Sequence, residues 1–194
     1  MVGTAAIQLV TKCGNHWIVA RCQTPGRPED QNAYRSELIG LLAGVMIAEW
    51  LRQQWFASCV ISPKVVQIGC DGLTAITNAF EDVALSPTQP QFDVLSTIHA
   101  SCELSSIRWR LRHMYGHRDN FLSPLTWWER RNVEGDAWAV QFRLSLPRDA
   151  RLSPPNPRFF VEPAALCVGG SKRSHRDPHF IHDHIALRWN LFLF

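Results

Sequence analysis

The sequence predicts a mixed α/β domain over roughly residues 1–144, with helices packed on a sheet. Three patterns predict this class. Between residues 38 and 51, apolar side chains recur three and four positions apart, as on one face of a long helix. The short β-branched run at 65–70 is typical of a buried strand. Apolar and arginine residues alternate over 107–114, as in a half-buried strand.

The front of the chain reads as a hairpin followed by a long helix. Segments 5–12 and 16–23 are extended and apolar, and residues 13–15 (Cys-Gly-Asn) have the composition of a tight turn. Residues 24–31 are rich in proline, glycine and charge, which predicts a loop. Apolar residues three and four apart then predict one helix over 33–56.

The middle of the chain predicts a buried strand at 60–70 that ends at Asp71, and a short helix at 72–79. A proline-rich break at 87–90 precedes a second helical stripe that begins at Phe92. These elements give the order β-β-α-β-α-α within the first hundred residues.

The last strand and helix of the domain carry stronger signals. In the strand at 107–114, Arg108, Arg110 and Arg112 share one face, because side chains alternate across a strand. Ser123-Pro124 is a typical helix start, with serine as the N-cap and proline in the first turn, and this predicts a helix to about Leu144.

Composition divides the chain near residue 145. Segment 145–194 holds seven Lys and Arg against four Asp and Glu, and it therefore supplies the whole net charge of +3. It also contains half of the prolines and half of the histidines, so we expect a Pro/Arg/His-rich tail that is partly ordered at best. The spacing of its four histidines matches no standard zinc site, and 186–194 could form an edge strand or a frayed end. The four histidines are His175, His179, His182 and His184.

Composition also limits the function classes. The longest apolar run has eleven residues, whereas a membrane span needs roughly 18 or more, so no membrane partner is expected. The start of the chain does not have the pattern of a secretory signal. The six scattered cysteines include no CxxC spacing, which predicts reduced thiols and an intracellular protein, cytoplasmic or nuclear.

Three acidic residues are placed where they could carry chemistry. Glu37 lies near the start of the long helix, Asp71 ends the buried strand, and Asp136 follows Asn132 by one helical turn. Each also has an ordinary explanation. Glu37 could interact favourably with the helix dipole, and Asp71 could cap the next helix. Asp136 could be a solvated acid among charged neighbours.

Taken together, these residues resemble the ribonuclease H domain, particularly the form attached to retroelement reverse transcriptases. The resemblance covers residues 1–144 and rests on four segments in the family's order. They are Tyr34–Leu38 (YRSEL), Gly69–Gly72 (GCDG), Tyr115–Asp119 (YGHRD) and Asn132–Ala137 (NVEGDA). The resemblance implies a mixed sheet with helices on both faces and hydrolysis of the RNA strand of an RNA–DNA hybrid.

The resemblance also implies the site residues and the cofactor. Glu37, Asp71 and Asp136 become catalytic ligands of two Mg²⁺ ions, which Mn²⁺ could replace, and His117 becomes a proton shuttle or an aid to product release. Arg35, Asn132 and the arginine face become candidates for contact with phosphate or the 2′-hydroxyl group. An ordinary solvated strand face remains an equal alternative for the three arginines. They are Arg108, Arg110 and Arg112.

One departure from the family bears on activity. The family has a fourth acid on a first strand that lies in the middle of the sheet, and here the predicted hairpin begins almost at Met1. We therefore expect a fragment without its first, central strand, with weak or no nuclease activity. The unpaired edge beside 65–70 would favour self-association.

Two alternatives to a nuclease stay open. One is a non-catalytic nucleic-acid-binding or structural remnant of the same fold. The other is an unrelated α/β domain in which Asp71 and Ser123 only cap helices. If Glu37, Asp71 and Asp136 did not approach one cleft, the unrelated α/β domain would be favoured.

Overall fold

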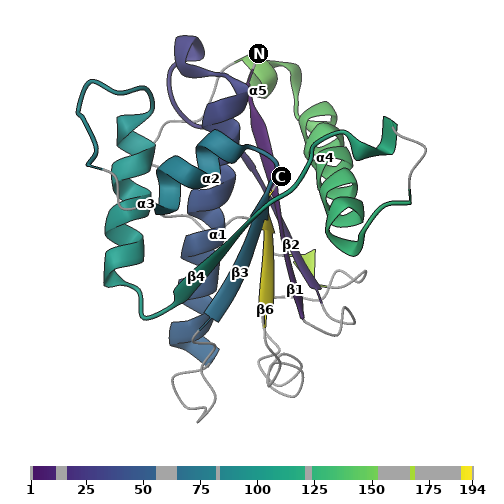
Figure 1. Cartoon of the computed structure of the whole chain (residues 1–194). Coiled ribbons are helices and arrows are strands. Elements are labelled where there is room, and N and C mark those ends of the chain that lie inside the picture. The colour runs from purple at the N-terminus through teal and green to yellow at the C-terminus, as the bar shows by residue number, and fades with distance from the viewer. Residues whose placement is uncertain are drawn as a thin grey trace.

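A six-stranded sheet with helices against both of its faces forms the body of the protein (Figure 1), which confirms the mixed α/β class. The strand order is β4-β3-β6-β1-β2-β5. This computed structural model describes residues 2–11, 17–55, 65–81, 84–120, 124–152, 167–168 and 189–193. The predicted turn at 13–15, Ser123 and the four tail histidines lie outside these residues.

The front hairpin and the long helix form where the sequence predicts them. Strands β1 (Thr4–Thr11) and β2 (Trp17–Gln23) pair antiparallel. Helix α1 (Ala33–Trp55) begins at the predicted residue, and its predicted end at residue 56 lies outside the described residues. Its first turn is capped by Asn32, whose Oδ1 accepts a hydrogen bond from the Arg35 backbone N–H at 2.8 Å. A 3₁₀ turn (Pro28–Asp30) lies in the preceding loop.

The central part of the chain adds two parallel strands and two helices. Strand β3 (Val65–Cys70) and strand β4 (Arg108–His113) pair parallel, with Val65 opposite Arg108. The chain between them forms α2 (Leu73–Phe80) and α3 (Phe92–Leu104). A β-α-β connection between parallel strands places helices over a sheet face, and α1, α2 and α3 lie together on one face (Figure 1).

The last long helix begins later than Ser123-Pro124 predicts. Helix α4 spans Trp127–Ser145, and Thr126 is its N-cap. Thr126 and Glu129 form a capping box in which the Glu129 carboxylate accepts from the Thr126 backbone N–H at 2.8 Å. This reciprocal pair satisfies two backbone donors at once, so it outweighs the Ser-Pro signal. A short 3₁₀ turn (Arg118–Asn120) precedes α4, and α5 (Arg148–Leu152) follows it.

The expected gap in the middle of the sheet is filled from the end of the chain. Strand β6 (Trp189–Leu193) lies between β3 and β1, parallel to β3 and antiparallel to β1. Strand β5 (Cys167–Val168) pairs with β2 at the sheet edge. Segment 145–194 therefore contributes two strands to the sheet, and the side of β3 that we expected to be unpaired is occupied.

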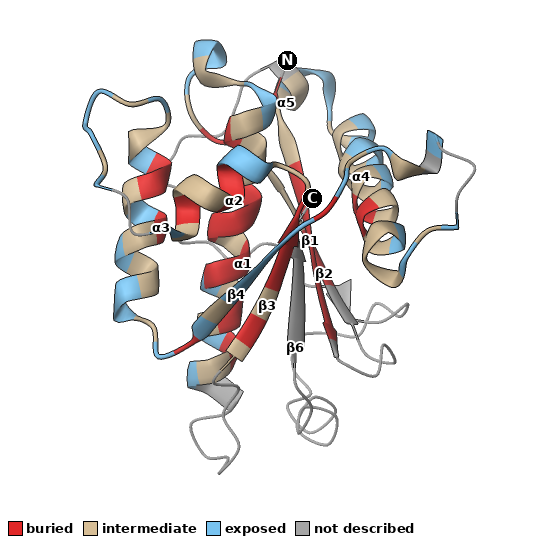
Figure 2. Ribbon diagram, in the orientation of Figure 1, coloured by how far each residue is buried: buried red, intermediate tan, exposed pale blue. Residues whose placement is uncertain are grey.

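Two apolar clusters hold the layers together. The larger one joins α1, α2 and α3 to the sheet, and Figure 2 shows buried positions along these helices and along β3. It includes Leu38, Leu41 and Ile68, which are fully buried. The smaller one lies under α4 and consists of Val10 and Met114 with two tryptophans, Trp127 and Trp128. None of the described helices is long and apolar enough to span a membrane.

Candidate functional site

Three elements bring acidic side chains toward the end of β3. Asp71 follows this strand directly, Glu37 lies in the second turn of α1, and Asp136 lies in the middle of α4. Asp71 does not cap α2, because Gly72 is the N-cap and no side chain bonds to the cap position. Glu37 lies beyond the first turn of α1, so interaction with the helix dipole does not explain its position.

Glu37 and Asp71 are held near each other by a close approach at Gly72. A Cβ atom added to Gly72 would lie 2.0 Å from Glu37 Oε2, so the carboxylate occupies the space that a side chain would fill. Gly72 is the residue next to Asp71. A glycine is therefore required for Glu37 to reach the end of β3 in this position.

Glu37 lies within reach of the negative charges of two other acids. Burial, together with the negative charges of Asp71 and Asp136, raises the pKa of Glu37 from 4.5 to about 7. Both neighbours act on Glu37 from other elements, so the three carboxylates share one electrostatic environment. A perturbed carboxyl group of this kind, produced by burial and by like charges, is typical of functional sites.

Asn132 links α4 to this group. Its side chain is 1% exposed, and its Nδ2 donates to Asp71 Oδ2 at 3.4 Å, a long hydrogen bond. Its Oδ1 atom is buried without a hydrogen-bond partner in the described part of the chain. A buried oxygen without a donor is costly, so this atom is available to a cation or to a ligand's hydroxyl group.

The end of β4 and the segment after it also lie against Asp71. His113 Nε2 lies 3.1 Å from the Asp71 carbonyl oxygen, and a Cβ atom at Gly116 would lie 2.9 Å from Asp71 Oδ2. His117 is exposed and has a φ of 53°, a left-handed conformation that is uncommon for a residue other than glycine. The predicted shuttle residue therefore lies one residue beyond the glycine that approaches Asp71.

The carboxylate oxygens and the amide oxygen of this group are the types of ligand that Mg²⁺ prefers in proteins. The side chains are not gathered into a finished cage. Among the described residues, no group of three or more His, Cys, Asp or Glu side chains is arranged to hold a metal ion.

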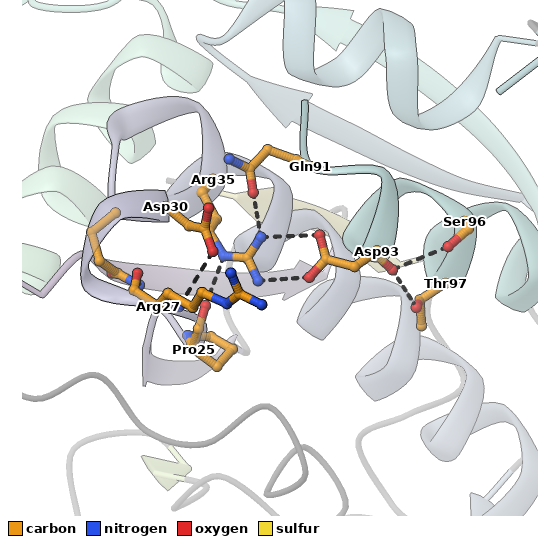
Figure 3. Close-up of polar contacts among 9 residues, drawn as sticks. Pro25, Arg27, Asp30, Arg35, Gln91, Asp93, Ser96 and Thr97 are labelled. Atoms are coloured by element: carbon orange, nitrogen blue, oxygen red, sulfur yellow. Dashed lines mark hydrogen bonds and ion pairs between the residues drawn. The ribbon is translucent and has the colours of Figure 1, made fainter. Parts of the chain in front are cut away.

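Arg35 does not have the role that the sequence predicts (Figure 3). Its guanidinium is buried; it donates through Nε to the Pro25 carbonyl at 2.7 Å and through Nη2 to Asp93 at 2.7 Å. It also donates to Gln91 and makes a second bond to Asp93. With its donors directed at these groups and 3% of the residue exposed, Arg35 cannot contact phosphate; it joins the start of α1 to the start of α3.

The arginine face of β4 is exposed, as predicted. Arg108, Arg110 and Arg112 are all exposed, while Trp109 between them is partly buried. The guanidinium carbon of Arg112 lies 5.2 Å from the centre of the Trp128 ring, a cation–π contact. Leu111 is 39% exposed, so the apolar face of this strand is less covered than the alternation suggests.

Sequence reasoning missed three groups at the site. Trp128 covers Gly69, where an added Cβ atom would lie 2.6 Å from the ring, and His113 approaches the backbone of Asp71. Gly69 lies two residues before Asp71. A glycine inside a strand indicates that another group approaches the backbone closely, and this is the signal that could have predicted a large side chain over the strand. The third is β6, which fills the central position but brings no Asp or Glu within 189–193.

Comparison with protein-family models, with curated proteins and with solved structures gives no match.

Proposed function

We propose that this chain is a ribonuclease H-like domain of the retroelement type that holds Mg²⁺ through Glu37, Asp71 and Asp136. One observation carries the proposal: Glu37 reaches over Gly72 to the end of β3, where the charges of Asp71 and Asp136 act on it. Like charges are kept together at a cost, and a bound cation offsets that cost. The Oδ1 atom of Asn132, which has no hydrogen-bond partner among the described residues, adds an uncharged oxygen ligand beside the carboxylates.

The reaction class follows from the ligands. When two Mg²⁺ ions are bound, they stabilise the attacking and the leaving oxygens of a phosphodiester. The chain's own residues hold the carboxylates in place: Asn132 orients Asp71 from α4, and Gly72 lets Glu37 approach. His117 is exposed one residue beyond Gly116, where its imidazole could take up or release a proton during the reaction.

The substrate class follows from the arginine face. Three exposed arginines at every second position of β4 suit the phosphate backbone of a nucleic acid, and this strand leads directly to Gly116 and His117. We propose an RNA–DNA hybrid as the substrate, with its backbone along β4 and the RNA strand at Asp71. Binding through phosphates should weaken as the salt concentration rises.

Catalysis should be weak, because the central strand supplies no fourth carboxylate. Residues 189–193 contain four apolar side chains and Asn190. Loss of one ligand removes several kcal/mol of transition-state stabilisation, and each 1.36 kcal/mol is about tenfold in rate. This feature also favours a second candidate function, a module that binds the hybrid without cleaving it.

Cleavage of a labelled RNA–DNA hybrid in Mg²⁺ and in Mn²⁺ distinguishes the two functions. A nuclease should cut slowly, Asp71→Asn should abolish cutting, and Glu103→Gln, which removes an exposed acid on α3, should not change it. Phe192→Asp places a carboxylate in β6 at the position paired with Gly69, and it should raise the rate about tenfold. Salt-sensitive binding without any cleavage would favour the binding module, and the absence of both would contradict the proposal.

A further inference from the structure

The middle of the sheet is a slot that the chain fills with its last described segment. On one side, residues 189–193 of β6 pair with residues 7–11 of β1; on the other, residues 190–192 pair with residues 67–69 of β3. The slot therefore presents two ladders of backbone donors and acceptors, from strands that lie on opposite sides of the strand that fills it. Any strand that enters it can form hydrogen bonds on both sides.

The connection to this strand is long. Strand β5 is paired with β2 and ends at Val168, and β6 begins at Trp189, so 20 residues separate the two strands. Twenty residues can still extend beyond the width of this sheet, since an extended chain spans up to roughly 3.3 Å per residue. The chain length therefore allows β6 to enter the slot of its own molecule or that of a neighbour.

Strand β1 buries a polar side chain within its ladder with β6. Gln8 of β1 pairs with Phe192, and the Gln8 side chain is 0% exposed. Neither its Nε2 nor its Oε1 has a hydrogen-bond partner among the described residues. An unsatisfied buried amide destabilises the closed sheet, which makes opening of the slot easier than in a sheet whose polar groups are all paired.

We propose that the slot between β1 and β3 is a strand-binding site that accepts residues 189–193 of a second copy of this chain. Two copies exchange these strands reciprocally and form a dimer. The exchanged strand makes the same backbone bonds as the strand of the same molecule, so the exchange conserves both ladders and requires no new interface. The proposal does not depend on the nuclease function.

Cysteine trapping between different molecules tests the exchange on the full chain. Val10 lies directly opposite Asn190 in the β1–β6 ladder, so cysteines at these two positions are close enough for a disulfide. The single variants Val10→Cys and Asn190→Cys are unfolded separately, refolded together and oxidised. A dimer linked between positions 10 and 190, identified by peptide mapping, is expected.

A mixture of Val10→Cys with Leu193→Cys is the matched control. Leu193 pairs with Ile7, three residues along β1, and a shift of about 10 Å exceeds the reach of a disulfide. The first mixture should give on the order of tenfold more linked dimer than the control. Peptide mapping separates this link from any formed by the six native cysteines.

A second measurement covers the case in which a variant fails to refold. Sedimentation of the wild-type chain should detect a dimer whose share increases with protein concentration during refolding. The proposal is overturned if the wild-type chain is a monomer at all concentrations. It is also overturned if the 10–190 link forms only within single molecules of a Val10→Cys/Asn190→Cys double variant.

Discussion

The face of the sheet that carries α1, α2 and α3 is packed with aliphatic side chains, whereas the face under α4 is packed with aromatic and polar ones. The first face buries a continuous cluster that includes Leu38, Ile68 and Leu95. On the second face, the buried positions of α4 are Asn132 and Gly135, and two tryptophans pack beside them. The comparison indicates that one face supplies stability, and that the other gives up apolar burial to hold the polar site.

The largest expected effect is on the aliphatic face. Leu38→Ala removes a fully buried side chain from α1 and should lower the free energy of unfolding by about 2–5 kcal/mol, because it leaves a cavity. Leu144→Ala on α4, where the leucine is 63% exposed, should change it by less than about 0.5 kcal/mol. Urea denaturation of both variants checks the difference, and equal losses would contradict the comparison of the two faces.

The next effect concerns the one strongly buried charge described on the α1 side. Arg35→Ala leaves the Pro25 carbonyl without its donor and separates α1 from α3, at an expected cost of about 2–3 kcal/mol. Asp93 can return to water because its side chain is 61% exposed, which limits the loss. Arg27→Ala, which removes a side chain that is 81% exposed in its pair with Glu29, is the control. Thermal melts that shifted equally for both variants would rule out the structural role of Arg35.

The third prediction concerns the pH dependence of stability at the polar site. The pKa of Glu37 is raised from 4.5 to about 7, so the folded state binds this proton more tightly than the unfolded state does. The resulting stability is present below pH 4.5 and is lost as pH rises through 7. Glu37→Gln should therefore be more stable than the wild type at pH 8, by on the order of 1 kcal/mol because the group is partly solvated.

The matching control is Glu103→Gln, which removes an exposed acid on α3. Urea midpoints at pH 4 and pH 8 give the comparison. A difference between Glu37→Gln and the wild type that stays constant across this range would show that Glu37 is not in the repelling group.

The smallest effect on stability is expected at Gly72. Gly72→Ala places a methyl group where Glu37 Oε2 now lies, and the flexible end of the glutamate can move away. The free energy of unfolding should fall by less than about 1 kcal/mol, while the affinity for Mn²⁺ falls about tenfold. Leu73→Ala, at the exposed neighbouring residue, should leave both unchanged. An unchanged affinity in Gly72→Ala would separate Glu37 from the cation site.

Local patterns predict the elements well where one signal dominates. The bounds of α1 follow from its apolar spacing, and the position of β4 follows from alternation. The predicted start of α4 is wrong because two capping signals lie three residues apart, and the Thr126–Glu129 pair is the one that caps α4. Sequence spacing shows which caps are available, but it does not show which cap forms its bonds.

Contacts between distant residues explain the rest. Arg35 has polar neighbours in sequence, and its burial depends on Asp93, which is 58 residues away. The central strand comes from residues 189–193, and nothing in that apolar segment specifies that it pairs with β1 and β3. The cation site of Glu37, Asp71 and Asp136 stays a prediction from the family resemblance, and Gly72 is the local feature that lets Glu37 approach the end of β3.

Binding of Mn²⁺ at pH 8, measured by electron paramagnetic resonance with Mg²⁺ as competitor, tests the central claim that three carboxylates form one cation site. At this pH Glu37 is ionised, since its pKa is about 7. The account predicts that Mg²⁺ displaces bound Mn²⁺, that Asp71→Asn weakens Mn²⁺ binding by about tenfold or more, and that Glu103→Gln does not. Equal Mn²⁺ affinity in the wild type and in Asp71→Asn would contradict it.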